Sequence, residues 1–291
     1  MLECGTTNPE PAQTVRKAAA RFDTRRIYTV LALGPLLYGA IRFLPPPAFT
    51  GLVAAAAGIA LYELYRLLFQ SSSRPLAVGI GLLGCTALIA SPHQPEMVVP
   101  CLLAALAAVL SIPLVLNVSF ADSFKAGALT LTGMLYVGLT SSYLVMTRLL
   151  PQGEWLIFFL LLVTWAGDTG AYYMGTLCGQ RLLAPRISPK KTVEGLVGGF
   201  IGAMIIAFVA RWWFLPDLSG LDCVILAALL TVAGLWGDLA ESAVKRSVGA
   251  KDSGGVLPGH GGMLDRLDSL LFAAPAFYYY VTLISRIGAS A

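Results

Sequence analysis

Apolar residues along the chain gather into nine long runs that are separated by short polar connections. Most of these runs reach or approach the roughly 17–25 residues that an α-helix needs to cross a bilayer. Proline and glycine mark several connections as turns. The pattern predicts an all-α, polytopic integral membrane protein with about nine transmembrane helices. The runs lie approximately at 27–44, 50–69, 76–90, 98–116, 128–147, 155–174, 196–214, 222–240 and 267–285.

The composition agrees with a chain that lies mostly in lipid. Hydrophobic residues make up 57% of the sequence, charged residues only 12%, and the mean hydropathy is +0.75. A soluble domain carries about 25% charged residues, so no soluble domain is expected. The net charge of +4 is too small and too dispersed to indicate a nucleic-acid partner.

The lengths of the connections divide the chain into three parts. A polar segment over 1–26 comes first, and the N-terminal transmembrane helices follow over 27–150. The C-terminal region, 151–291, contains the two long connections, 175–195 and 241–266, and both are rich in charge and glycine. We therefore expect the chemistry to lie in this C-terminal region.

The distribution of Lys and Arg predicts the orientation. With nine spans and a cytoplasmic N-terminus, 16 of the 20 basic residues lie on the inner side of the membrane and four on the outer side. This asymmetry follows the positive-inside rule. Both long connections then face the cytoplasm. A short chain with little mass outside the membrane fits a bacterial inner (plasma) membrane.

The eighth run ends in polar residues that share one helical face. Asp238, Glu241, Ser242 and Lys245 are spaced i, i+3, i+4, i+7, which places them in one stripe of a helix. A solvated helix end is the plainer explanation. Ionisable groups at membrane depth are costly and usually functional, so we favour a site.

A glycine-rich stretch follows, with Lys251, Asp252 and His260 among its residues. Glycines such as Gly261 and Gly262 let backbone N–H groups come close to phosphate oxygens. The stretch therefore predicts phosphate contact rather than a simple flexible turn. His260 is either a general acid or a loop residue that fixes the backbone.

Carboxylates on two helices suggest a metal. Asp265 and Asp268 lie on the first turn of the helix that leads into the ninth run, and Asp168 lies inside the apolar sixth run. Negative charge also suits a helix N-terminus, so Asp265 alone would be read as a cap. Two carboxylates beside a phosphate-binding stretch suit Mg²⁺, which completes its octahedron with phosphate oxygens and water.

A second basic segment contains Ser188, Lys190 and Lys191 just before a helix start. Hydroxyl and ammonium groups at such a place suit an anionic phosphate, although the lysines alone would also serve as a topology signal. Glu63 and Arg66, three residues apart in the second run, are interpreted as a structural pair.

These groups together indicate phosphoryl or nucleotidyl transfer onto a membrane-embedded substrate. At this point the C-terminal stretch resembles the signature of phosphatidate cytidylyltransferases (CDP-diacylglycerol synthases). The residues that carry the resemblance are Ser-x2-Lys-Arg-x4-Lys-Asp-x5-Pro-x-His-Gly-Gly-x2-Asp-Arg-x-Asp, from Ser242 to Asp268. The segments around Asp168 and over 188–195 are similar to that family as well. The segment 175–180 departs from it, because the family usually has a more basic sequence there.

The resemblance implies transfer of CMP from CTP to phosphatidic acid with Mg²⁺, release of pyrophosphate, and a homodimer. Asp238, Asp265 and Asp268, joined by Asp168, are expected to bind one or two cations. We expect Lys245 and His260 to act in catalysis with these carboxylates. The remaining predicted contacts are with substrate: Ser188, Lys190, Lys191, Ser242, Arg246, Lys251, Asp252, Gly261, Gly262 and Arg266.

Two alternatives stay open. A CTP-dependent kinase of a polyprenol-type lipid alcohol would need a base for a neutral hydroxyl and would release CDP. An ion-coupled transporter would use Asp168, Asp238 and Lys245 as an ion pathway. The lack of an inverted repeat and the concentration of polar residues at one membrane face argue against the transporter.

Overall fold

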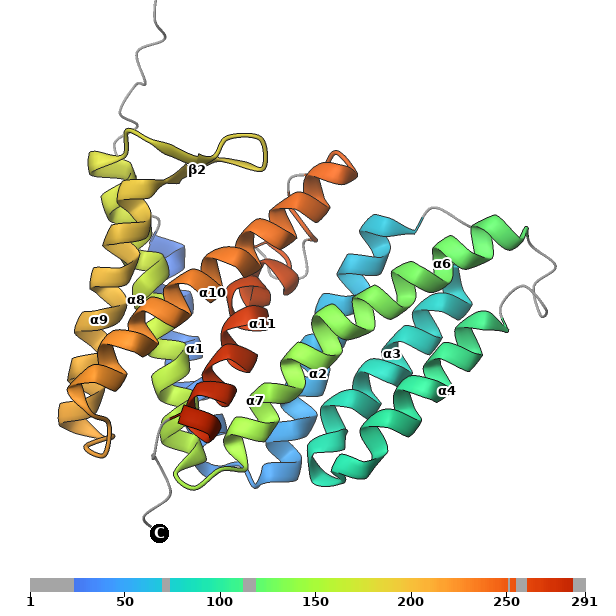
Figure 1. Ribbon diagram of the computed structural model, residues 1–291, viewed down its shortest axis with the longest axis horizontal. Coiled ribbons are helices and arrows are strands. Elements are labelled where there is room, and N and C mark those ends of the chain that lie inside the picture. Colours follow the sequence, from blue (N-terminus) through green and yellow to red (C-terminus); the bar gives the residue numbers. More distant parts are fainter. Residues whose placement is uncertain (1–23, 70–73, 112–118, 251, 255–260, 285–291) are drawn as a thin grey trace, which may run out of the picture. The chain divides into compact units, whose positions relative to one another are not determined.

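The computed structural model describes residues 24–69, 74–111, 119–250, 252–254 and 261–284. The chain separates into two units, Met1–Leu37 and Tyr38–Ala291. The described residues of the first unit belong to helix α1, Thr24–Phe43, which continues into the second unit. The other elements all belong to the second unit (Figure 1).

Helices account for nearly all of the described chain. The N-terminal half contains α2 (Pro46–Leu68), α3 (Arg74–Ala90), the short 3₁₀ turns η1 (Ser91–His93) and η2 (Pro95–Met97), α4 (Val98–Leu110), α6 (Phe120–Gly133), the π-helix η3 (Met134–Leu139) and α7 (Thr140–Arg148). The C-terminal half contains α8 (Gly153–Cys178), α9 (Val193–Trp213), α10 (Gly220–Ser247), α11 (Leu264–Tyr279) and the π-helix η4 (Tyr280–Ile284).

Six helical segments in the described chain are long and apolar enough to cross a membrane. They are Pro46–Leu68, Pro75–His93, Ala121–Arg148, Gly153–Cys178, Val193–Trp213 and Gly220–Ser247. The prediction of a helical, polytopic membrane protein is therefore confirmed. Each of the nine apolar runs overlaps a helical segment, but α1, α4 and α11 are not among the six, so nine spans stay a prediction.

A small β-hairpin interrupts the helical pattern where the sequence analysis expects only a loop. Strands β1 (Leu182–Ala184) and β2 (Ser188–Thr192) pair antiparallel, with Leu182 opposite Thr192. The carboxylate of Glu194 accepts the backbone N–H groups of Gln180 and Arg181 at 3.0 and 3.2 Å, so the first turn of α9 holds the base of the hairpin. Thr192 caps α9 by accepting the N–H of Gly195.

Glycines allow α8 and α9 to lie unusually close together. A Cβ atom on Gly202 would lie 2.6 Å from the carbonyl oxygen of Ala166, and one on Gly170 would lie 2.4 Å from that of Gly198. Small residues at a helix interface let two backbones approach in this way. The close pairing fixes the wall of α8 and α9 on which the site is built (Figure 1).

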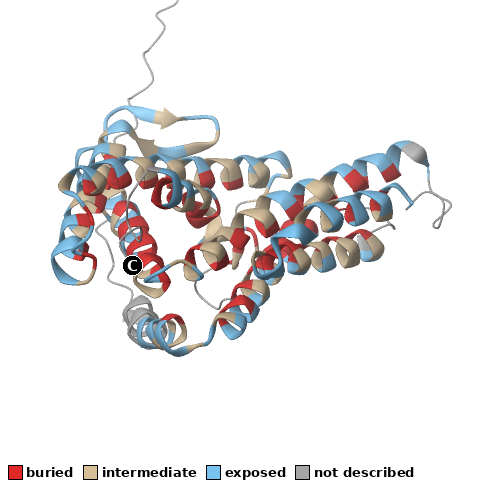
Figure 2. Ribbon diagram, turned by 60° about the horizontal axis from the view of Figure 1, so that its bottom comes forward, coloured by how far each residue is buried: buried red, intermediate tan, exposed pale blue. Residues whose placement is uncertain are grey.

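Buried positions follow the faces on which helices meet, and exposed positions follow the outward faces (Figure 2). Tyr65 of α2 is fully buried, and its hydroxyl donates to the carbonyl oxygen of Thr130 on α6 at 2.6 Å. Large apolar side chains such as Leu83, Trp212 and Leu283 are exposed. Outward apolar faces of this kind are suited to lipid rather than to water.

The close α8–α9 contact predicts that Gly202→Ala destabilises the protein. The added methyl group meets the backbone of Ala166, and overpacking of a fitted contact costs about 1–3 kcal/mol. The thermal unfolding midpoint in detergent should fall. Gly51→Ala is the matched control, because Gly51 lies in α2 with nothing within 4 Å of its Cβ position. Equal midpoints for both variants would contradict the prediction.

Candidate active site

Five elements of the C-terminal half surround a cavity of about 430 Å³. Its polar wall carries four carboxylates, two lysines and two serines, and the remaining wall is largely apolar or glycine. The cavity thus has both a charged and an apolar wall, which is the combination that a phosphate-bearing lipid requires. The polar residues named are Asp168 of α8, Ser188, Lys190 and Lys191 of β2, Asp238 of α10, and Asp265, Asp268 and Ser269 of α11.

The crossing of α10 and α11 brings three carboxylates together. Gly237 lies against the backbone of Asp268, where a Cβ atom would come within 2.1 Å of its carbonyl oxygen. Because of this close approach, ligand oxygens of Asp238, Glu241 and Asp268 all lie within 4.8 Å of one another. We call these three residues the carboxylate cluster. Asp168 lies nearby on the cavity wall and accepts the hydroxyl of Ser269 at 3.5 Å.

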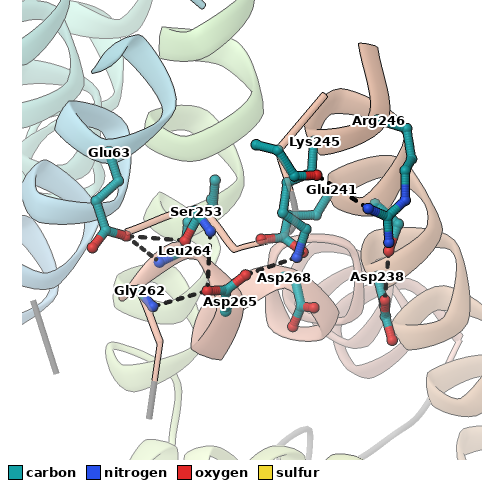
Figure 3. Close-up of polar contacts among 12 residues, drawn as sticks. Glu63, Asp238, Glu241, Lys245, Arg246, Ser253, Gly262, Leu264, Asp265 and Asp268 are labelled. Carbon is teal, nitrogen blue, oxygen red and sulfur yellow. Dashed lines mark hydrogen bonds and ion pairs between the residues drawn. The ribbon is translucent and has the colours of Figure 1, made fainter. Parts of the chain in front are cut away.

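Two lysines compensate part of this negative charge. Lys191, on β2, places its Nζ atom 2.6 Å from Asp238, so the hairpin is tied to α10 across the cavity. Lys245 lies between Glu241 and Asp265, and its Nζ atom is 2.7 Å from the Oδ1 atom of Asp265 (Figure 3). Glu241 is almost fully buried, so this ion pair is shielded from solvent.

Asp265 binds the backbone beside its own helix start. Its Oδ2 atom accepts the N–H groups of Gly262 at 2.8 Å and Ser253 at 3.3 Å. Gly261 has a φ of +78°, a conformation that favours glycine. Burial alone would raise the pKa of Asp265, but its contacts with the Lys245 ammonium and the Gly262 N–H outweigh burial and hold this pKa below its usual range. Asp265 therefore stays ionised.

The donors of the carboxylate cluster fit a hard divalent cation. Oxygen ligands are the ones that Mg²⁺ prefers. The buried Oε1 atom of Glu241 has no hydrogen-bond partner within the described residues, and a buried acceptor of this kind calls for a donor or a cation. Among the described residues of the cavity and the cluster are five carboxylates and three lysines, a set whose acidic groups suit a cation.

Most of the predicted site residues for which the structure describes positions lie in or beside this cavity. Ser242 donates its hydroxyl to Asp238 at 3.3 Å, while Arg246 donates to the carbonyl oxygen of Ala250 at 3.1 Å and does not line the cavity. Asp252 and Arg266 are exposed and do not line the cavity. Lys251 and His260 lie outside the described residues.

Three residues belong to the site or contact it without being predicted there from the sequence. Glu241 is predicted on the polar stripe but not among the metal carboxylates. Its position three residues after Asp238 places both carboxylates on one helical face and could have indicated a shared metal. Ser269 follows Asp268 directly, and nothing in its local pattern marks it. Glu63 is interpreted as a structural partner of Arg66, yet within the described residues no ion pair joins them, and Glu63 instead contacts the C-terminal half.

The fold and site define a class of protein: a helical membrane protein whose acidic, lysine-lined cavity suits phosphate chemistry on a lipid. The sequence profile of the Cytidylyltransferase family matches residues 24–284, and the chain therefore belongs to that family. The chain is 36% identical over 242 residues to the phosphatidate cytidylyltransferase of Bacillus subtilis (strain 168), covering 81% of this chain and 90% of that protein.

Two other relatives match over shorter lengths. The phosphatidate cytidylyltransferase of Staphylococcus saprophyticus is 45% identical over 153 residues, covering 53% of this chain and 58% of that protein. The uncharacterized protein YnbB of Escherichia coli (strain K12) is 44% identical over 135 residues, 46% of this chain and 45% of that protein. The resemblance to phosphatidate cytidylyltransferases drawn from the C-terminal signature is thus confirmed.

The position of Lys245 predicts that Lys245→Met strongly destabilises the protein. The change leaves Glu241 and Asp265 as neighbouring carboxylates without their shared cation, and breaking a buried pair in this way costs about 3–5 kcal/mol. Unfolding in detergent is the measurement. Arg246→Met is the control, since Arg246 is exposed and, in the part of the chain that the structure describes, donates to the backbone carbonyl of Ala250 and to no carboxylate. Adding Glu241→Gln should recover part of the loss, and full stability of Lys245→Met would disprove the pairing.

Proposed function

We propose that the protein transfers CMP from CTP to phosphatidic acid, giving CDP-diacylglycerol and pyrophosphate for phospholipid biosynthesis. The observation that carries this function is the cavity in which Asp168, Asp238, Asp265 and Asp268 face Lys190 and Lys191 between apolar helices. Its relatives named phosphatidate cytidylyltransferase support the same activity. The enzyme is a membrane nucleotidyltransferase, and the kinase and transporter alternatives are not favoured.

The proposed reaction does not require the enzyme to activate the nucleophile. An oxygen of the phosphatidate phosphate forms a bond to the α-phosphorus of CTP, and the bond from that phosphorus to the oxygen bridging to the β-phosphate breaks. Pyrophosphate leaves with the electron pair. Because the attacking phosphate is already an anion, no strong general base is needed. The protein must align the two phosphates and neutralise their charge.

The lysines supply the neutralising charge in this proposal. Lys190 and Lys191 reach the cavity from the hairpin, and Lys191 is held in place by Asp238. Lys245 of α10 is held by Asp265 and Glu241. An ammonium group that is fixed before the substrate arrives stabilises developing negative charge without reorganising.

We infer that Asp238, Glu241 and Asp268 hold Mg²⁺, with Asp168 close by. When bound, this ion would neutralise phosphate oxygens and polarise the α-phosphate. The support is the close approach of the three carboxylates and the unpartnered Oε1 atom of Glu241. For Asp265 we propose a different role from metal binding, because both of its oxygens already bind protein donors.

The proposed activity predicts where labelled phosphates of CTP appear. Purified protein in detergent is given phosphatidic acid, Mg²⁺ and CTP labelled at either the α- or the γ-phosphate. The α-label should enter the lipid and the γ-label should leave in pyrophosphate. Transfer of the γ-label to an added lipid alcohol would instead establish the kinase, and movement of neither label would overturn the enzyme.

Two further arms of this assay examine the metal. EDTA should abolish transfer, and Glu241→Gln should raise the Mg²⁺ concentration that gives half-maximal rate by at least about tenfold, a typical loss for a metal-site change. Glu96→Gln is the matched control, because Glu96 is exposed in η2, away from the site. An unchanged Mg²⁺ dependence of Glu241→Gln would remove Glu241 from the metal site.

We also propose nine spans with a cytoplasmic N-terminus in a bacterial inner membrane, the arrangement that the Lys and Arg asymmetry supports. Exposed Cys178, beside the hairpin, should then react with a membrane-impermeant maleimide only from the cytoplasmic side. Gln152→Cys, on an exposed connection, should react only from the other side. The reverse result would invert the topology. A homodimer, which the family resemblance implies, belongs to the same proposal and is measured by the protein mass in detergent.

A further inference from the structure

Glu63 is a buried carboxylate near the C-terminal end of the largely apolar helix α2, far in sequence from the residues of the site. Its side chain is only 2% exposed. A carboxylate is costly to bury unless it is hydrogen-bonded or paired. The partners of Glu63 are therefore informative, and they lie about 200 residues further along the chain.

Glu63 binds both described ends of the glycine-rich stretch. Its Oε2 atom accepts the backbone N–H of Leu264 at 3.0 Å and the hydroxyl of Ser253 at 3.3 Å (Figure 3). Leu264 is the first residue of α11, and the preceding residue, Met263, provides no side-chain cap. Glu63, which belongs to α2, thus accepts a hydrogen bond from an N–H group that has no partner within α11. The helix dipole also favours a negative charge at this helix start.

The glycines on either side of this contact are shaped to the Glu63 carboxylate. A Cβ atom on Gly254 would lie 2.5 Å from its Oε1 atom, and one on Gly262 would lie 2.5 Å from its Oε2 atom. Both distances are far below van der Waals contact. A side chain at Gly254 would therefore clash with the carboxylate from α2, and one at Gly262 would clash with both that carboxylate and the Ser253 hydroxyl, 2.1 Å from the Cβ position.

Glu63 and Asp265 both bind Ser253 and each binds one further residue beside the start of α11. Ser253 donates its hydroxyl to Glu63 and its N–H to Asp265, while Gly262 donates its N–H to Asp265. Asp265 in turn binds Lys245 through its other oxygen. A continuous series of contacts thus runs from Glu63 through Ser253 and Asp265 to the ammonium group of Lys245.

We propose that Glu63 is a positioning residue for the nucleotide-transfer reaction. It fixes Ser253 and the start of α11 so that Asp265 presents Lys245 to the phosphates of CTP. This inference rests on the proposed function, since the phosphates belong to that reaction. It also assigns a role in the site to the N-terminal half of the chain, whose sequence otherwise consists of apolar helices.

The alternative is that Glu63 only stabilises the fold. The two roles differ in what they do to the kinetics. A purely structural loss reduces the amount of active enzyme, so the apparent kcat falls and KM for CTP does not change. Misplacement of Lys245 weakens contact with the nucleotide phosphates, so KM for CTP rises as kcat falls.

The test measures CDP-diacylglycerol formation over a range of CTP concentrations at saturating phosphatidic acid and Mg²⁺, beside thermal unfolding of each variant. Glu63→Ala should lower kcat/KM for CTP on the order of 100-fold, the effect of a small misplacement in an active site. Ser253→Ala, which removes one of the two contacts, should raise KM for CTP in the same direction. Glu63→Gln should stay within about tenfold of wild type, since it exchanges a charge-assisted hydrogen bond for a neutral one.

Glu96→Ala is the matched control and should leave the kinetics at wild-type values, because Glu96 is an exposed glutamate of the same half of the chain. A combined variant adds a second criterion. Because Glu63 and Asp265 hold the same segment, Glu63→Ala should cost much less in an Asp265→Asn background than alone, a non-additivity expected of coupled residues.

Wild-type kinetics in Glu63→Ala, beside an active wild-type protein, would overturn the inference. So would a fall in kcat that equals the unfolded fraction while KM for CTP is unchanged. A wild-type protein that makes no CDP-diacylglycerol would be a different result, because it contradicts the proposed function and removes the inference with it. Restoration of KM by Glu63→Gln together with unchanged unfolding midpoints would establish the positioning role.

Discussion

The contact of Lys245 with Glu241 and Asp265 is the interaction on which the site depends. Glu241 lies in α10, a helix apolar enough to cross a membrane, and its side chain is nearly inaccessible to solvent. An uncompensated charge is costly in such a place. Lys245 compensates it and at the same time draws the start of α11 against the end of α10. The same ammonium group therefore sets the electrostatics of the site and the placement of Asp268 beside Asp238.

Glycine determines how close the elements of the site can come. Gly237 lets α10 approach the backbone of Asp268, and this approach places the carboxylate cluster at the crossing of α10 and α11. Gly202 and its neighbours do the same for α8 and α9. Close backbone approach replaces the hydrophobic driving force that helices lack within lipid. The glycines are thus as necessary to the site as the charged residues, although they carry no chemistry.

The two halves of the chain contribute unequally but are not independent. In the described part of the chain, the residues that line the cavity belong to α8, α9, α10, α11 and β2. The N-terminal half nonetheless supplies the carboxylate of Glu63 at the start of α11. A site built on a helix start needs that helix to be oriented, and the first turn of a helix has free N–H groups that an outside acceptor can bind. Glu63 provides that acceptor from α2.

The sequence by itself determined the helical membrane architecture, the acidic and basic residues of the C-terminal half, and the family. Spans follow from the length of apolar runs, and the polar stripe of α10 follows from helical spacing, so both are local properties. Only the tertiary structure decided which of these polar groups contact one another. Asp265 binds Lys245 and backbone N–H groups, Glu241 joins Asp238 and Asp268, and Glu63 meets residues about 200 positions away. Those contacts depend on helix crossings and glycine approaches that span the chain, and no periodicity along the sequence records them.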